Sequence, residues 1–328
     1  MKTVYLIGNG FDLNLGLKSS YNDFYGFYKI QESDSYPVKN FKDNISNNID
    51  KWSDLELALG EYTKEINSLD ELDDIHENIV EELAEYLTLA QKQFTKEKIS
   101  SINNEKFIED LFHPEKFLLV RDAISLRKFF GGKDRRHNFY SIVNFNYTHT
   151  AEHILGLNNI SNRNSNLKIE KKEDVGLHRL DSIFHVHGTI DSDMVIGVDN
   201  AEQIINKELS NNIDATNHLI KRDCNLVMRH GIESDCEKLI SEADLICIFG
   251  SSIGETDQLW WDLIAEQLKE RNCRLIVFEY LPSINKRRSQ LLERRRRALL
   301  KKFIAPEELE AVSKHVYFSF NSEMFFLN

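Results

Sequence analysis

Asparagine and histidine side chains occur where they could position a nucleophile and take up its proton. Asn146 lies in NFNYT at 144–148, and two histidines, His185 and His187, lie in HVHG at 185–188. An asparagine can hold a water molecule or a hydroxyl group by hydrogen bonds, and a histidine that titrates near neutrality can accept its proton. We therefore expect Asn146 and His187 to be catalytic, and His185 to be a hydrogen-bonded structural residue.

Two glycine-rich segments could hold the phosphates of a ligand. The first is GNG at 8–10, and the second is GSS at 250–252. Glycine allows close backbone approach to an anion, and the following helix N-terminus offers free N–H groups. A plain strand-to-helix turn is the alternative, since Leu13 replaces the third glycine of the dinucleotide fingerprint. The predicted ligand-binding residues are Gly8, Asn9, Gly10, Asp12, Gly250, Ser251, Ser252, Asp257 and Glu279.

A metal bound by His185 and His187 is a further alternative. Alternation along a strand would put both rings on one face. Zinc needs at least a third ligand, and no suitably spaced partner is evident. The four cysteines lie far apart, between 224 and 273, without a C-x-x-C pair. We therefore predict no metal site.

Six short apolar runs must position these residues. They are rich in β-branched and aromatic residues, which is typical of parallel strands covered on both faces. Segments long enough to form helical crossovers separate several of them, so the pattern predicts an α/β fold. The runs are 3–7, 139–145, 183–187, 245–249, 275–280 and 316–320.

The polar and glycine-rich motifs all follow or close these runs. In open α/β sheets, ligands bind in a crevice outside the carboxyl ends of the strands. We therefore expect the motifs at 8–10, 144–148, 185–188 and 250–252, together with Glu279, to line one crevice.

The segment 51–134 contains no strand-like run and is predicted to be a helical insertion. The core would then consist of 1–50 and 135–328. Residues 54–87 include twelve acidic residues and a single lysine, Lys64, which indicates a solvated acidic face.

A basic stretch at 285–303 carries nine lysines or arginines and one acid, Glu293. We expect a helix with one apolar side on the sheet and a cationic outer side that points away from the crevice. This helix could bind nucleic acid, and a nuclease that also uses the paired histidines is conceivable. Contact with the acidic 54–87 segment, within one chain or in a homo-oligomer, is the alternative. The cationic residues are Arg294, Arg295, Arg296 and Arg297.

The amino-acid composition argues against some classes of binding partner. The 328 residues carry a formal net charge of −12, which argues against a whole-molecule affinity for nucleic acid or anionic membrane. No apolar run approaches the roughly 18 residues of a membrane span, and the first residues turn polar too early for a signal peptide. We predict a cytoplasmic protein without membrane contact.

Four blocks of the sequence resemble the AbiH family of bacterial phage abortive-infection proteins. They are LIGNGFDLNLGLKSSYNDF at 6–24, FNYTHTAEH at 145–153, HVHG at 185–188 and FGSSIGETDQLWW at 249–261. The resemblance implies a role in phage defence.

The order of these motifs is also similar to that of the sirtuin NAD-binding fold. This resemblance implies a Rossmann-like sheet with helical insertions, and NAD or another nucleotide as ligand. Asn146 would match the motif asparagine and His187 the catalytic histidine, while Gly250 and Ser252 would match the dinucleotide loop. Thr148 stands where those relatives have aspartate, and no paired cysteines could form their zinc module, so protein deacylation is not expected.

In NAD the bond between nicotinamide and ribose breaks through an oxocarbenium-like state, and nicotinamide leaves as a neutral molecule. The site then needs a positioned nucleophile and a base, but no acid. We therefore expect NAD hydrolysis at this bond, with Glu279 available to a ribose hydroxyl. A nucleotide sensor without turnover is the alternative.

Overall fold

The computed structural model describes residues 1–157, 160–229, 231–270, 272–282 and 289–327. Its centre is a seven-stranded sheet in the order β3-β4-β2-β1-β5-β6-β7. All neighbouring strands run parallel except β3 and β4, which form an antiparallel pair. The strands are β1 (Lys2–Ile7), β2 (His137–Asn144), β3 (Arg163–Glu173), β4 (Gly176–His185), β5 (Leu245–Phe249), β6 (Arg274–Glu279) and β7 (Val316–Phe320).

Helices cover both faces of this sheet. Side chains of β1 alternate between two cores, with Tyr5 and Ile7 in one and Val4 and Leu6 in the other. The first core includes residues of α1 (Gly10–Leu15), α6 (Asn104–Phe112), α7 (Val120–Gly131) and α8 (Thr150–Leu155). The second includes residues of α12 (Ile232–Glu242), α13 (Gln258–Glu270), α14 (Ser289–Leu300) and α15 (Leu309–Ser313).

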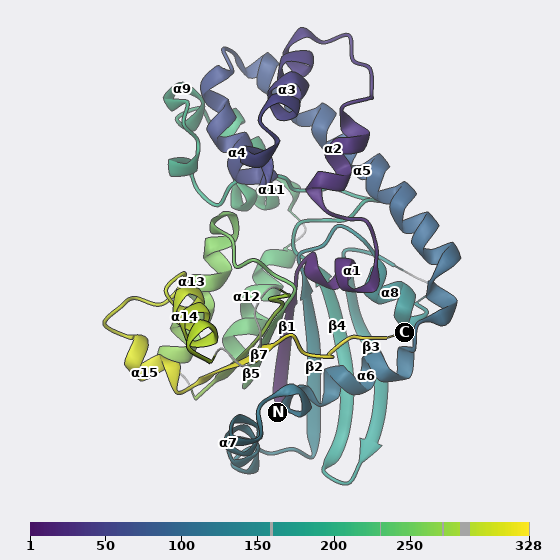
Figure 1. Cartoon of the computed structure of the whole chain (residues 1–328), viewed down its shortest axis with the longest axis vertical. Helices are drawn as coiled ribbons and strands as arrows, with labels where there is room; N and C mark the ends of the chain where they lie inside the picture. Colours follow the sequence, from purple (N-terminus) through teal and green to yellow (C-terminus); the bar gives the residue numbers. More distant parts are fainter. Residues whose placement is uncertain (158–159, 230, 271, 283–288, 328) are drawn as a thin grey trace.

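A third core lies beyond the carboxyl ends of the strands, in the upper part of Figure 1. The 29-residue α5 contributes to this core through Leu72 to Leu87 and to the first sheet core through Phe94. The helices around the third core are α2 (Tyr21–Tyr28), α3 (Tyr36–Asn47), α4 (Leu55–Tyr62), α5 (Leu69–Glu97), α9 (Lys207–Ser210), α10 (Ile213–Leu219) and α11 (Lys221–Met228).

The strand order reverses at β1. The chain builds β2 and β4 on one side of β1 and then crosses to the other side to form β5. Such a reversal leaves a crevice at the carboxyl ends of the strands, where ligands bind in open α/β sheets.

The α/β prediction and all six predicted strands are confirmed. β4 starts at Gly176, well before the expected residue 183, and β3 was missed because its polar, exposed edge residues form no apolar run. All elements between 51 and 134 are helical, as expected. The division into a core and an insertion at residue 51 stays a prediction, and α2 and α3 pack in the same core as α4 and α5.

Within the described part of the chain, no helix is both long enough and apolar enough to cross a membrane.

Candidate functional site

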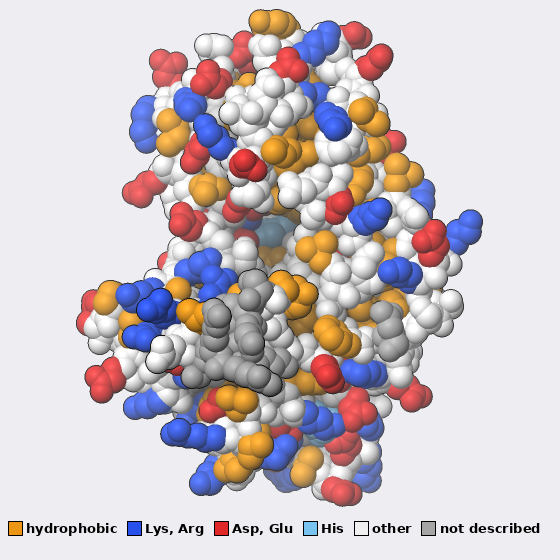
Figure 2. Space-filling model, in the orientation of Figure 1, with side chains coloured by type: hydrophobic (Ala, Val, Ile, Leu, Met, Phe, Trp, Pro, Cys, Tyr) orange, Lys and Arg blue, Asp and Glu red, His pale blue; other side chains and the backbone are white. Residues whose placement is uncertain are grey.

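A cavity of about 1230 Å³ opens at the carboxyl ends of the central strands. Figure 2 shows the surface hollowed between the sheet and the helices above it. All the residues that we predicted from the sequence to act in catalysis or ligand binding line this cavity. These are Gly8, Asn9, Gly10, Asp12, Asn146, His187, Gly250, Ser251, Ser252, Asp257 and Glu279.

The two glycine-rich loops pack directly against each other. The Gly10 N–H donates to the Gly250 carbonyl oxygen at 2.7 Å, and the Gly8 N–H donates to that of Phe249 at 2.9 Å. A Cβ atom on Gly10 would lie 2.6 Å from the Gly250 Cα atom, and Gly250 itself has φ +70°. These glycines are therefore required for contact between the loops, whatever they do for a ligand.

Four ionisable side chains, three of them buried and Asp257 partly buried, form a chain along the cavity wall. The Lys221 Nζ atom lies 2.7 Å from Glu56 Oε2 and 2.8 Å from Asp257 Oδ1. The His187 Nε2 atom lies 2.9 Å from the same Asp257 oxygen. Glu56 comes from α4, Lys221 from the start of α11 and Asp257 from the turn before α13, so the network joins the third core to the sheet.

The environment sets the charges of this network. Burial alone would raise the pKa of Asp257, but Lys221 and His187 lower it well below its ordinary value. Burial and the Lys221 ammonium lower the pKa of His187, against the pull of Asp257. Burial raises the pKa of Glu56 to about 7, although Lys221 opposes this shift.

His187 therefore has a defined tautomer. Its pKa is below the ordinary value, so the ring is neutral at neutral pH. Its Nε2 atom faces a carboxylate oxygen of Asp257 and must carry the hydrogen. The remaining basic nitrogen is Nδ1, which is buried and has no hydrogen-bond partner among the residues that the structure describes.

Asn146 is held by the loop that follows β2. Its Nδ2 donates to the Gly8 carbonyl oxygen at 3.3 Å, and its backbone N–H donates to Asn144 Oδ1 at 3.1 Å. The backbone carbonyl oxygen of Asn146 accepts a hydrogen bond from His185 Nδ1 at 2.8 Å. The amide side chain is thus fixed between the first glycine loop and the cavity.

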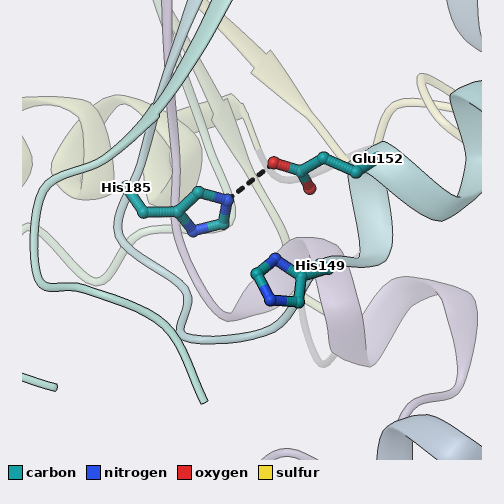
Figure 3. Close-up of side chains that lie close together, drawn as sticks. All are labelled: His149, Glu152 and His185. Carbon is teal, nitrogen blue, oxygen red and sulfur yellow. Dashed lines mark hydrogen bonds and ion pairs between the residues drawn. The ribbon is translucent and has the colours of Figure 1, made fainter. Parts of the chain in front are cut away.

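A second buried cluster lies close to Asn146 and consists of His149, Glu152 and His185 (Figure 3). The His185 Nε2 atom is 2.7 Å from Glu152 Oε1. The predicted hydrogen-bonded role of His185 agrees with these contacts.

Asp12 lines the cavity and accepts a hydrogen bond from the Thr148 hydroxyl. Burial raises the pKa of Asp12 to about 6.

The expectation that His185 and His187 share one strand face was wrong. β4 ends at His185, so strand alternation does not extend to His187. The two rings bond to different acids, Glu152 and Asp257, and belong to different networks.

The expectation that the arginines of the basic helix point away from the crevice was wrong for Arg295. Its guanidinium lies 2.5 Å from Glu279, the acid at the end of β6, and lines the cavity. Arg296 donates to the Val316 carbonyl oxygen at 3.0 Å, whereas Arg294 and Arg297 are exposed.

The start of the predicted basic helix, 285–288, lies outside the described residues. Among the residues that are described, no ion pair joins 289–303 to the acidic 54–87 segment.

Sequence reasoning missed four residues of the two networks, namely Glu56, Lys221, His149 and Glu152. Glu56 was counted within a solvated acidic face, yet it is only 7% exposed. Lys221 is part of no recognisable motif, because its partners Glu56 and Asp257 lie far from it in the sequence. The spacing of His149 and Glu152, three residues apart at the start of a helix, puts both on one side and could have revealed the second cluster.

Comparison with known proteins identifies the family. The model of the family described as bacteriophage abortive infection AbiH matches residues 4–279, and no curated protein matches the chain. The matched region contains both networks and most residues that line the strand-end cavity, while Arg295 and a few other lining residues follow it. The chain therefore belongs to the AbiH family of bacteriophage abortive infection proteins.

Proposed function

We propose that this protein acts in abortive infection by hydrolysing NAD, or a related nucleotide, at the bond between its base and its ribose. The observation that carries the proposal is the neutral His187, oriented by Asp257, in the same cavity as Asn146. A histidine oriented by a carboxylate is the usual arrangement of a general base.

The architecture supports a nucleotide as the ligand. Without the antiparallel β3, the strand order is β4-β2-β1-β5-β6-β7, which corresponds to the order 3-2-1-4-5-6 of dinucleotide-binding sheets. The cavity of about 1230 Å³ is at or above the usual volume of ligand sites, which supports a ligand as large as a dinucleotide.

The phosphates would lie along the 250–254 loop. The N–H groups of Gly8, Gly10 and Phe11 already donate to backbone carbonyls and are not available to them. Arg295, on the cavity wall beside Glu279, would supply positive charge, and Glu279 would accept a bond from a ribose hydroxyl.

The proposed reaction is a single substitution at the ribose carbon C1′. Asn146 holds a water molecule, whose oxygen forms a bond to C1′. The bond from C1′ to the nicotinamide nitrogen breaks, and its electron pair neutralises the positive ring. The proton lost by the water passes to Nδ1 of His187, because Nε2 already carries a hydrogen. The products are nicotinamide and ADP-ribose.

The test is nicotinamide release by purified protein, followed by mass spectrometry with NAD as substrate. We expect Asn146→Ala and His187→Gln each to lower the rate by about 10²- to 10⁴-fold, the usual worth of general-base catalysis. Glutamine at 187 keeps a hydrogen bond to Asp257 but cannot act as a base.

Matched controls lie on the same strands, far from the cavity. Asn138 is on β2 and His178 is on β4, and both are buried and hydrogen-bonded. Asn138→Ala and His178→Gln should leave the rate unchanged in folded protein.

Two outcomes would contradict NAD hydrolysis and favour another function. Tight NAD binding without nicotinamide release, with and without phage infection, would make the protein a sensor. Salt-dependent binding or cleavage of nucleic acid that is lost on reversing the charges of Arg294 and Arg297, with no effect of NAD, would favour the nucleic-acid function.

A further inference from the structure

The cluster of His149, Glu152 and His185 has the composition of a metal site. The three residues offer two imidazole nitrogens and a carboxylate oxygen, and these ligand atoms all lie within 4.8 Å of one another. The set of two histidines and one glutamate occurs in zinc enzymes. His149 and Glu152 come from the start of α8, and His185 comes from the end of β4.

Both imidazoles are oriented by a partner on the far nitrogen. The His185 Nδ1–H donates to the Asn146 carbonyl oxygen at 2.8 Å, and the His149 Nε2–H donates to Asp191 Oδ2 at 2.9 Å. Metal-binding histidines nearly always donate their second nitrogen to a carbonyl or carboxylate in this way. The remaining nitrogen of each ring is therefore the one turned toward the cluster, as Figure 3 shows for His149.

Two atoms of the cluster have unused binding capacity. His149 Nδ1 and Glu152 Oε2 are buried and have no hydrogen-bond partner among the described residues. The exposed fraction is 3% for His149 and 0% for Glu152. Unpartnered polar atoms at such depth are costly, and a bound cation would satisfy both.

We propose that His149 Nδ1, His185 Nε2 and the Glu152 carboxylate bind one divalent transition-metal ion with the ligand preferences of Zn²⁺. Tetrahedral coordination with bonds of about 2.0–2.1 Å puts neighbouring ligand atoms roughly 3.3 Å apart. The present pair of His185 Nε2 and Glu152 Oε1, at 2.7 Å, would open by roughly 0.6 Å as the ion replaces the shared proton.

The ion would stabilise the loop that carries Asn146. His185 would be a metal ligand through one nitrogen and hold the Asn146 carbonyl through the other. His149 follows Asn146 by three residues on the same loop, so both ends of this short segment would be tied to the ion. The metal-site proposal does not rest on the proposed NAD reaction, because none of its three ligands lines the cavity and metal binding is measured without NAD.

The test uses the full-length protein, freed of metal and titrated with Zn²⁺ and with Co²⁺ as a spectroscopic probe. We expect one ion per chain and a visible Co²⁺ spectrum of a nitrogen and oxygen site. His149→Ala, Glu152→Gln and His185→Ala should each weaken Zn²⁺ affinity by about 100-fold or more, since each removes a ligand or its charge.

Two further variants guard against misfolding and adventitious binding. Asp191 is exposed, so Asp191→Asn leaves the fold intact while it weakens the orientation of His149, and should lower affinity about 10- to 100-fold. His153 lies on the same helix but outside the cluster, so His153→Ala should bind Zn²⁺ normally.

The proposal is wrong if the wild-type chain binds no stoichiometric Zn²⁺ or Co²⁺. It is also wrong if binding survives in folded Glu152→Gln and Asp191→Asn at full affinity, or is lost in His153→Ala. In each of these cases the cluster is an internal ion pair between His185 and Glu152.

Discussion

At the scale of single residues, the charge of Lys221 shifts the pKa values of the side chains around it. It contacts both Glu56 and Asp257, and its ammonium contributes to the lowered pKa of His187. Burial and this nearby cation together lower the pKa of His187, while Asp257 fixes the orientation of the imidazole. A buried charge network of this kind is typical of functional sites.

Replacing Lys221 with methionine should raise the pKa of His187. The substitution removes a positive charge that disfavours the imidazolium and leaves Asp257 less neutralised, and both effects act in the same direction. The measurement is an NMR titration of the histidine rings in folded protein. His153, whose charged neighbours are Glu152 and Asp191, serves as the internal reference. An unchanged His187 titration would show that Lys221 does not set its charge state.

Glu56 should make the fold less stable as the pH rises. Its pKa is raised by burial to about 7, so the folded state holds a proton that the unfolded state, with an ordinary pKa near 4.5, has lost. The contribution to stability is complete below about pH 4.5 and disappears as the pH rises through 7. The titratable groups around Glu56 include Lys221, Asp257, Asp54, Tyr147 and Tyr21, and Thr256 donates a hydrogen bond to its carboxylate at 3.0 Å.

The test compares wild type with Glu56→Gln by urea unfolding at pH 5 and pH 8. Glutamine does not titrate, so the stability of the variant relative to wild type should be higher at pH 8 by up to about 3 kcal/mol. Parallel stability profiles for the two proteins would mean that Glu56 stays charged throughout.

At the scale of elements, the contact between the two glycine loops is the most sensitive point. Gly250→Ala would place a Cβ atom 2.5 Å from the Phe11 nitrogen at a residue with φ +70°. We expect a loss of about 2–4 kcal/mol in unfolding free energy from the clash and the strain together.

Gly26 provides the matched control. It lies within α2, and nothing stands within 4 Å of its missing Cβ atom. Gly26→Ala should therefore stabilise the protein by about 0.5–1 kcal/mol through helix propensity. If Gly250→Ala unfolds like wild type, the two loops are not in contact in solution.

The strands and the cavity lining could be predicted from sequence, because both depend on local patterns. The run 245–249 is apolar and fully buried, and the glycine motif after it must lie at its carboxyl end. The parallel direction of the strands then brings Gly8, Asn146 and Gly250 to one edge of the sheet.

Pairings between distant elements could not be predicted in this way. Glu56 and Lys221 are 165 residues apart, and each looks like an ordinary surface residue until α4 and α11 are packed together. Arg295 likewise turned out to face Glu279 because the position of α14 depends on how its apolar side docks on the sheet. Charge patterns identify exposed faces but not the few charges that become buried.

At the scale of the whole molecule, α5 connects the third core to the sheet. It spans from Leu72, in the third core, to Phe94, in a sheet core, without interruption. Because one rigid element belongs to two cores, we expect the protein to unfold as one cooperative unit.

A proline in α5 between Leu87 and Phe94 should uncouple the unfolding of the third core from that of the sheet. Leu89 is half-exposed, so Leu89→Pro removes little packing but costs about 3 kcal/mol or more in helix geometry. Calorimetry should show two transitions for this variant, and one for Leu89→Ala, which keeps the helix. A single transition for the proline variant would mean that contacts outside α5 hold the parts together.

The loop between β2 and α8 imposes a constraint on length. Within 144–149, Asn146 faces the cavity, and His149, three positions later, faces the buried cluster. An added or deleted residue between them would carry one of these side chains away from its place, whatever its chemistry. Relatives of this protein should therefore tolerate substitutions in the loop more readily than insertions, in contrast to the turn between β3 and β4 on the edge of the sheet.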